Sequence, residues 1–281
     1  MSHPWMPTSP CGDGCLPRRP DRVSALTVCA RWGALALTVS CSALLPLVRI
    51  LPPTTRTAVH RLLARSALRG IGIRLDVEGR ASIGTGMLVV AGHVSWADAL
   101  VLAAVVPGRF VARADLVAWP LVGGVARRAG IIPIERARLW ELPGTVAQVR
   151  ERLGAGETVI AFPEGTTWCG QAFGRFRPAL FQAAIDADRL VLPVSIDYIT
   201  ASGSRTTGLS FVGDEGIGAS IRRVLRSRGL RVKVVVGAPQ VPGSCRGELA
   251  RRCEWQVRRR VDDSTRRILA QLEGRRHESA A

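Results

Sequence analysis

The chain has 281 residues, of which 47% are hydrophobic, and this content excludes a largely disordered protein. The length accommodates one large α/β domain, with or without a membrane-anchoring segment. The formal net charge of +17 comes almost wholly from arginine, since Lys233 is the one lysine, and predicts an anionic partner. Aromatic residues make up 5%, and the sequence has no helix-turn-helix or zinc-finger spacing, so a membrane surface is favoured over nucleic acid.

The N-terminal residues 1–22 are rich in proline, glycine and arginine, a composition that predicts disorder. Seven cysteines, an odd number, are scattered along the chain and do not indicate a disulfide framework. Cys11 and Cys15 stand close together but lack a second ligand pair, so no metal site is expected.

An uncharged, mostly apolar stretch covers residues 32–48, at the short end of what a membrane-spanning helix needs. It is long enough to span or to enter and return, and Pro46 interrupts a simple helix. A cleaved signal peptide is the alternative, although the polar lead is long for one. Arginines on both sides give no clear orientation and favour a monotopic anchor: Arg18, Arg19, Arg22 and Arg31 before it, and Arg49, Arg56, Arg61 and Arg65 after it.

Residues 57–69 are predicted to form a helix that ends at Gly70, with Arg61, Arg65 and Arg69 at four-residue spacing on one face. That face either meets lipid headgroups or is a solvated surface. Residues 23–70 are therefore predicted to be a membrane-anchoring region.

Beyond residue 70, short β-branched runs alternate with longer helical patterns. This alternation predicts an α/β fold, a mostly parallel twisted sheet flanked by helices, for the main domain at residues 71–245. The predicted strands lie at residues 71–77, 87–91, 109–112, 130–134, 158–162, 191–196 and 230–236. A four-residue apolar repeat predicts an amphipathic basic helix within residues 246–281: Leu249, Cys253, Val257 and Val261.

An apolar predicted strand ends just before His93, and Asp98 follows five positions later. The other three histidines lie in polar terminal segments or among arginines. The pair suits a general base with its orienting carboxylate. Ser95 and Asp98 also fit a helix capping box, and the two interpretations can coexist because a helix starting near Ser95 would hold Asp98 in its first turn.

Other predicted strands also end in polar groups. Arg136 follows the strand at residues 130–134, where its forked guanidinium either clamps a phosphate or is an ordinary exposed arginine. The strand at residues 158–162 leads into a turn whose groups can bind an anion or orient a hydroxyl: Glu164, Gly165, Thr166 and Thr167.

Two arginines, Arg175 and Arg177, follow this turn, and Pro193 inside the next predicted strand indicates a bulge or a strand end. In their order and spacing, the blocks around His93, Arg136, Glu164 and Pro193 resemble the four motifs of the glycerolipid acyltransferase family, which includes 1-acyl-sn-glycerol-3-phosphate acyltransferase (lysophosphatidic acid acyltransferase). The resemblance spans roughly residues 71–239, and the N-terminal hydrophobic segment is similar to that family's membrane anchor.

The resemblance implies an enzyme on the cytoplasmic face of a membrane that moves a fatty acyl group from acyl-CoA or acyl carrier protein to the free hydroxyl of a lysolipid. His93 would take the hydroxyl proton while Asp98 fixes its tautomer, without an acyl-enzyme. Arg136 would contact a phosphate, and Glu164, Gly165 and Thr166 would bind the acceptor. The implied partners are membrane lipids, the acyl donor as co-substrate and the lysolipid, with no nucleic acid, metal or further cofactor.

One departure concerns Thr167. Many family members that act on glycerol phosphates have an arginine there, so a phosphate contact is missing unless Arg175 or Arg177 replaces it. We expect 1-acyl-sn-glycerol-3-phosphate as the acceptor. The alternatives are another lysolipid, such as lyso-ornithine lipid, and a non-catalytic basic membrane-binding protein.

Overall fold

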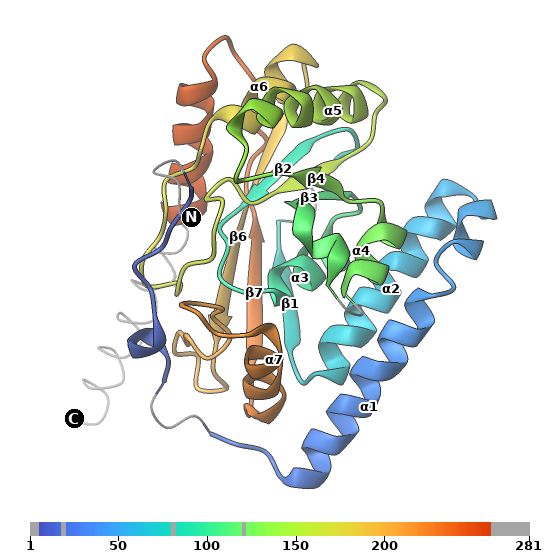
Figure 1. The fold of residues 1–281 in the computed structure, drawn as a ribbon, viewed down its shortest axis with the longest axis vertical. Coiled ribbons are helices and arrows are strands. Elements are labelled where there is room, and N and C mark those ends of the chain that lie inside the picture. The colour runs from blue at the N-terminus through green and yellow to red at the C-terminus, as the bar shows by residue number, and fades with distance from the viewer. Residues whose placement is uncertain (1–5, 18–20, 80–82, 120–121, 260–281) are drawn as a thin grey trace, which may run out of the picture.

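The computed structural model describes residues 6–17, 21–79, 83–119 and 122–259, which form one sheet with helices on both faces (Figure 1). The sheet has seven strands in the order β1-β7-β6-β2-β5-β3-β4. They are β1 (Arg74–Glu78), β2 (Leu88–Ala91), β3 (Arg109–Arg113), β4 (Ile132–Ile134), β5 (Val159–Ala161), β6 (Val191–Ile199) and β7 (Arg231–Val236).

All neighbouring strands are parallel except β6 and β7, so the predicted mostly parallel α/β sheet is confirmed. The run from β6 through β2, β5 and β3 to β4 has one direction, and the carboxyl ends of these strands therefore lie at one edge. Pro193 lies inside β6 and not at its end, at the point where pairing with β7 begins at Val194, and the strand continues to Ile199.

Two hydrophobic cores lie on the two faces of the sheet. One is covered by α2 (Pro53–Gly70), α3 (Ala97–Val105) and α7 (Ile217–Arg226). The other is covered by α5 (Leu142–Gly154), α6 (Ala179–Asp186) and the helix at residues 246–259. Successive residues of β2 point into alternate cores, as expected for a parallel strand buried on both faces. Leu88 packs in the second core and Val89 in the first.

The helix predicted at the C-terminus is present, and its residues Leu249, Cys253 and Val257 are buried in the second core, whereas Val261 lies outside the described residues. Between β3 and β4 the chain forms the short helix η4 (Ala114–Ala118) and α4 (Val122–Ala129), and η5 (Leu139–Glu141) precedes α5.

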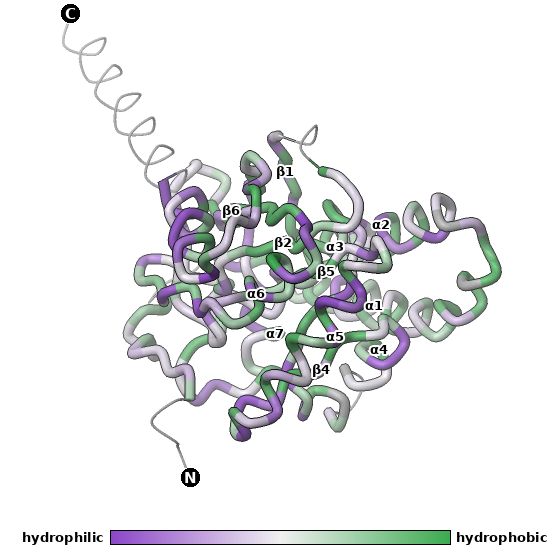
Figure 2. The backbone as a smooth tube through the Cα atoms, turned by 90° about the horizontal axis from the view of Figure 1, so that it is seen from above, coloured by the Kyte–Doolittle hydropathy of each residue, from purple (hydrophilic) through white to green (hydrophobic). Residues whose placement is uncertain are grey.

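An N-terminal pair of helices projects from this domain. Helix α1 (Ala25–Ser42) begins at Ser24, whose hydroxyl accepts a hydrogen bond from the Thr27 N–H, and lies along α2 (Figure 1). The connection through η2 (Leu47–Ile50) forms the projecting, hydrophobic tip seen in Figure 2. By length and composition alone α1 could cross a membrane, with a mean hydropathy of 1.3 and 6% of its residues buried.

The apolar stretch at residues 32–48 is therefore not one helix. Helix α1 starts before it and ends at Ser42, and Pro46 then begins the short helix η2, so the chain turns back into α2. Several large apolar side chains of this hairpin face solvent, namely Leu26, Trp32, Leu37, Leu44, Leu47, Ile50 and Leu62.

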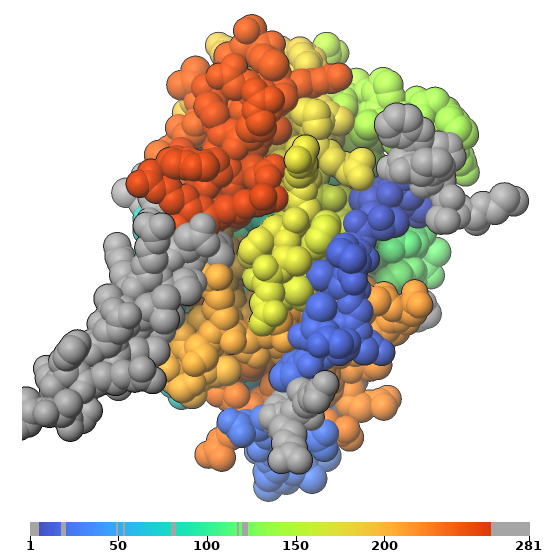
Figure 3. Space-filling model, turned by 90° about the vertical axis from the view of Figure 1, so that its left-hand side faces the viewer, coloured from blue at the N-terminus to red at the C-terminus, as the bar shows by residue number. Residues whose placement is uncertain are grey.

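Residues 6–17, whose composition predicts disorder, instead lie against the rest of the protein. Figure 3 shows this segment running across one face beside the stretch that follows β5. Cys11 is 7% exposed and packs with Cys169 and Val212, and Leu16 adds to the contact. A small cluster of thiols and apolar side chains thus holds a segment whose composition is otherwise polar.

Candidate active site

His93 lies two residues beyond the end of β2, and Asp98 lies in the first turn of α3. The His93 Nδ1 atom is 2.9 Å from Asp98 Oδ2. The His93 side chain is 18% exposed, whereas the Asp98 side chain is fully buried. With Nδ1 engaged, Nε2 is the ring nitrogen left to accept a proton from a bound molecule.

Three further donors surround the Asp98 carboxylate. The backbone N–H groups of Val94 and Ser95 donate to Oδ2 at 2.7 and 2.8 Å, and the Tyr198 hydroxyl donates to Oδ1 at 2.6 Å. Asp98 therefore binds the backbone at the start of α3 and the imidazole at the same time, so the two interpretations of this motif coexist in the structure.

The turn after β5 forms hydrogen bonds with both backbone polar groups of His93. The His93 N–H donates to Glu164 Oε2 at 2.8 Å, and the Trp168 N–H donates to the His93 carbonyl at 2.8 Å. The Phe162 ring stacks on the imidazole, with centroids 4.1 Å apart and an interplanar angle of 14°. The first and third sequence blocks thus form one site at the carboxyl edge of the sheet.

Glu164 is buried, and its pKa is raised to about 8. Burial is the main cause; the His93 N–H and the charge of Arg258 act in the opposite direction, and Asp98 adds to the rise. The carboxyl group faces the backbone of His93, so it positions that residue in the fold. Gly165, with φ of +75°, has no room for a side chain, because a Cβ would lie 2.8 Å from Pro7 Cγ.

Three arginines gather near the ends of β3 and β4 and the loop before α6. The pKa of Arg136 is lowered to about 10, mainly by burial and then by the charges of Arg113 and Arg177, while Asp115 opposes the shift. Arg136 is half-buried, whereas Arg113 and Arg177 are exposed, and like charges gathered at the edge that carries His93 form an environment suited to an anion.

The remaining predicted site residues differ in position. Thr166 is half-buried. The Thr167 hydroxyl donates to the Phe211 carbonyl, so it braces the loop. Arg175 is exposed and, within the described part of the chain, takes no part in the arginine cluster that Arg177 joins.

Sequence reasoning missed Tyr198, Phe162 and Arg113 as site residues. Arg113 directly follows the strand predicted at residues 109–112, so the rule that selected Arg136 would have found it. Tyr198 is the one tyrosine of the chain, but its contact with Asp98 depends on how β6 pairs with β2.

A hollow of about 900 Å³ lies elsewhere, and no candidate site residue lines it. It is bordered by Arg31, Arg65, Arg69, Arg74 and Arg231. Among the described residues, no metal-binding group surrounds His93; the one such group found consists of three cysteine thiols that include Cys169, just past Trp168.

Comparisons with known proteins agree with this geometry. The model of the family described as Acyltransferase matches residues 74–197. The chain is 34% identical to the 1-acyl-sn-glycerol-3-phosphate acyltransferase of Neisseria gonorrhoeae, over 65% of this chain and 71% of that one. It is 33% identical to the lyso-ornithine lipid O-acyltransferase of Pseudomonas aeruginosa, over 80% of this chain and 88% of that one. The fold is similar to that of the 1-acyl-sn-glycerophosphate acyltransferase PlsC from Thermotoga maritima, with a TM-score of 0.66 and 21% identity over 85% and 94% of the two chains.

The buried Glu164 makes stability depend on pH. Its pKa of about 8 in the folded protein exceeds its ordinary value of 4.5, so the folded chain binds more protons between these values. The stability contributed by Glu164 is fully present below about pH 4.5 and is lost as pH rises through about 8. We expect the free energy of unfolding of the unmodified protein to fall, relative to that of Glu164→Gln, by a few kcal/mol between about pH 5 and pH 9.

Chemical denaturation in detergent at both pH values measures this difference. Glu151→Gln, which changes an exposed glutamate on α5, serves as the control and should keep the original pH dependence. Parallel curves for the unmodified protein and Glu164→Gln would contradict the raised pKa.

Proposed function

The chain belongs to the acyltransferase family and is a lysolipid acyltransferase; we propose that His93 is its general base and that its acceptor is 1-acyl-sn-glycerol-3-phosphate. The observation that carries the catalytic proposal is the hydrogen bond of 2.9 Å between His93 Nδ1 and a fully buried Asp98. Burying a carboxylate costs free energy, and a histidine without a catalytic role does not require a buried carboxylate that is held by three further donors.

In the proposed reaction the acceptor hydroxyl attacks the carbonyl carbon of an acyl thioester, the donor being acyl-CoA or acyl carrier protein. His93 Nε2 takes the hydroxyl proton as the new C–O bond forms. The tetrahedral intermediate then breaks its C–S bond, and the imidazolium returns the proton to the leaving thiolate. The products are the acylated lipid and a free thiol, with no acyl-enzyme.

Asp98 acts through His93. Its Oδ2 atom fixes the tautomer with the proton on Nδ1, and its negative charge favours the imidazolium that forms during attack. The Phe162 ring and the carboxyl of Glu164 keep the imidazole and its backbone in place before substrate binds. The backbone N–H groups of Glu164 and Thr166 are our candidates for stabilising the oxyanion, since that of Gly165 donates to the Phe162 carbonyl.

The arginine cluster supports the proposed acceptor. Arg136 and Arg177, with Arg113 beside them, can pair with the charges of a phosphate monoester. Arg177 thereby supplies the cation that the sequence lacks at Thr167, whose hydroxyl is occupied by the Phe211 carbonyl. In this proposal the phosphate holds the lysolipid so that its hydroxyl meets His93.

The second candidate acceptor is lyso-ornithine lipid. The relative from Pseudomonas aeruginosa, named for that lipid, matches 80% of this chain, whereas the relative from Neisseria gonorrhoeae matches 65%. The carboxylate of an ornithine headgroup would pair with one or two guanidinium groups in place of a phosphate. A direct comparison of the two acceptors at equal concentration separates the candidates.

We also propose that the hairpin of α1 and α2 anchors the protein as a monotopic enzyme, with its active site at the cytoplasmic face. The exposed apolar side chains of the hairpin and the length and composition of α1 support this placement. An anchored catalytic domain would meet its lysolipid within the membrane surface, while the acyl donor arrives from water.

His93→Ala should lower the turnover number at least about a hundredfold, because it removes the general base. The measurement is free-thiol release from acyl-CoA by the detergent-solubilised protein, with lysophosphatidic acid as acceptor. Asp98→Asn should also lose most turnover, because the imidazolium loses its counter-charge. His60→Ala, which changes an exposed histidine on α2, is the control and should retain full activity.

Full turnover in a folded His93→Ala protein would contradict the proposed role of His93 as general base. If lysophosphatidic acid supports no thiol release, acyl carrier protein is the donor to try next. Turnover of lyso-ornithine lipid alone would replace the acceptor that we propose while leaving the family assignment intact.

Arg177→Ala and Arg175→Ala form a matched pair on one loop. We expect Arg177→Ala to raise the KM for lysophosphatidic acid roughly tenfold or more, since a hydrogen bond to a charged group contributes about 1.5–3 kcal/mol. Arg175→Ala should change the KM less than about twofold, because Arg175, although as exposed to solvent as Arg177, does not act on the charge of Arg136. Equal effects of the two substitutions would argue against a phosphate site at Arg136 and Arg177.

The anchor is tested with Leu37 and Leu47, both 64% exposed. Changing both to serine should weaken partition into anionic phospholipid vesicles at least tenfold, because each buried leucine contributes about 1.5–3 kcal/mol. Leu190 and Val241, exposed on the catalytic domain, give the control pair. Unchanged vesicle flotation of the Leu37→Ser, Leu47→Ser variant would refute the anchoring role of the hairpin.

A further inference from the structure

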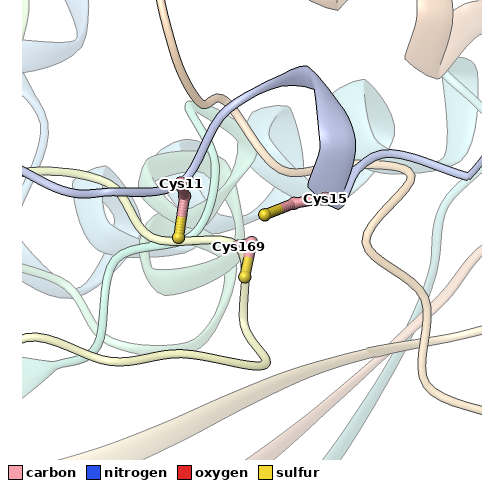
Figure 4. A group of neighbouring side chains, drawn as sticks. All are labelled: Cys11, Cys15 and Cys169. Carbon is pink, nitrogen blue, oxygen red and sulfur yellow. The ribbon is translucent and has the colours of Figure 1, made fainter.

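Three free cysteines from distant parts of the sequence meet beside the candidate active site. Cys11 precedes the short helix η1 (Asp13–Cys15) in the N-terminal segment, Cys15 is the last residue of that helix, and Cys169 lies in the loop after β5. Their three sulfur atoms all lie within 4.8 Å of one another. Figure 4 shows Cys11 and Cys15 approaching Cys169 from the segment that crosses this loop.

Apolar side chains line the three thiols. Cys11 and Cys169 are buried, and Cys15 is half-buried. Val212, Leu16, Trp168 and Ala172 pack around them. The Ser210 hydroxyl donates to the Cys169 carbonyl at 2.8 Å, which fixes the backbone that carries this thiol. An apolar lining and a held backbone orient the ligands of a metal site.

We propose that Cys11, Cys15 and Cys169 bind one Zn²⁺ ion as thiolates. Zinc–sulfur bonds of about 2.3 Å in a tetrahedral site separate the sulfur atoms by about 3.8 Å. The present separations, all within 4.8 Å, reach that value through small side-chain rotations. The described residues contribute three ligands, so the fourth position is left to water or to another donor.

A disulfide explains the cluster less well. It would join two of the sulfur atoms at about 2.05 Å and leave the third thiol unpaired in a buried shell. Disulfides are also rare in the reducing cytoplasm, where the proposed active site lies. Three thiolates converging on one point suit a soft or borderline cation, and zinc is the common structural choice.

The position of the ion indicates which two segments it would join. Cys169 directly follows Trp168, whose N–H holds the His93 carbonyl, and Pro7 covers Gly165 in the same turn. Zinc at this point would join the N-terminal segment to the loop that positions the histidine. We assign it a structural role, and the assignment is independent of which lysolipid is the acceptor.

The first test is the metal content of the full chain, purified in detergent without chelators and under reducing conditions. Inductively coupled plasma mass spectrometry should find about one zinc per chain, and at least tenfold less in Cys11→Ser and in Cys169→Ser. Cys29→Ser and Cys245→Ser, which change exposed thiols away from the cluster, should keep the zinc of the unmodified protein. Zinc in Cys169→Ser equal to that of these controls would overturn the proposal.

The second test does not depend on how the variants fold. Cobalt exchanged into the unmodified protein should give thiolate-to-metal charge-transfer absorption and the intense visible bands of a tetrahedral site. Absence of metal together with a mapped disulfide among the three cysteines would also overturn the proposal, whether or not acyl transfer is observed.

Discussion

The whole site depends on the burial of one carboxylate. Asp98 has no exposed side-chain surface, and an ionised carboxylate in such a place is tolerated when its oxygens are hydrogen-bonded. The His93 ring, two backbone N–H groups and the Tyr198 hydroxyl meet this requirement. Each donor is held by an element that must be correctly placed, so the loop after β2, the first turn of α3 and strand β6 are coupled through one side chain.

Strand direction explains why these groups can meet. Ala91, the last residue of β2, is paired with Val194, and β6 continues beyond that pair to Ile199. Tyr198 therefore stands past the end of β2, level with the loop that carries His93. Because β5 and β3 run in the same direction as β2, Glu164 and Arg113 reach the same edge of the sheet from their own strand ends.

The seven strands and the pairing of His93 with Asp98 could be predicted because they depend on short-range pattern: apolar runs, helix signals and a five-residue spacing. Tyr198 could not be assigned, since its contact with Asp98 joins residues 100 positions apart. The same limit applies to Cys169, whose neighbours Cys11 and Cys15 form, in the sequence, a pair without further ligands. The composition of residues 6–17 did not predict that this segment packs against the protein. A few thiol and apolar contacts hold it in place despite its many prolines and glycines.

The number of arginines in the chain and their positions in the fold carry different information. Several arginines bind backbone carbonyls within the fold: Arg31 donates to those of Leu225 and Ser227, and Arg65 to that of Ala104. These residues add to the formal charge of +17 while serving the packing of α1 and α2 against the domain. Total charge therefore predicts an anionic partner without locating it. Arg136 is our candidate for the acceptor because of its place at the carboxyl edge, where its burial and the neighbouring guanidinium groups favour an anion.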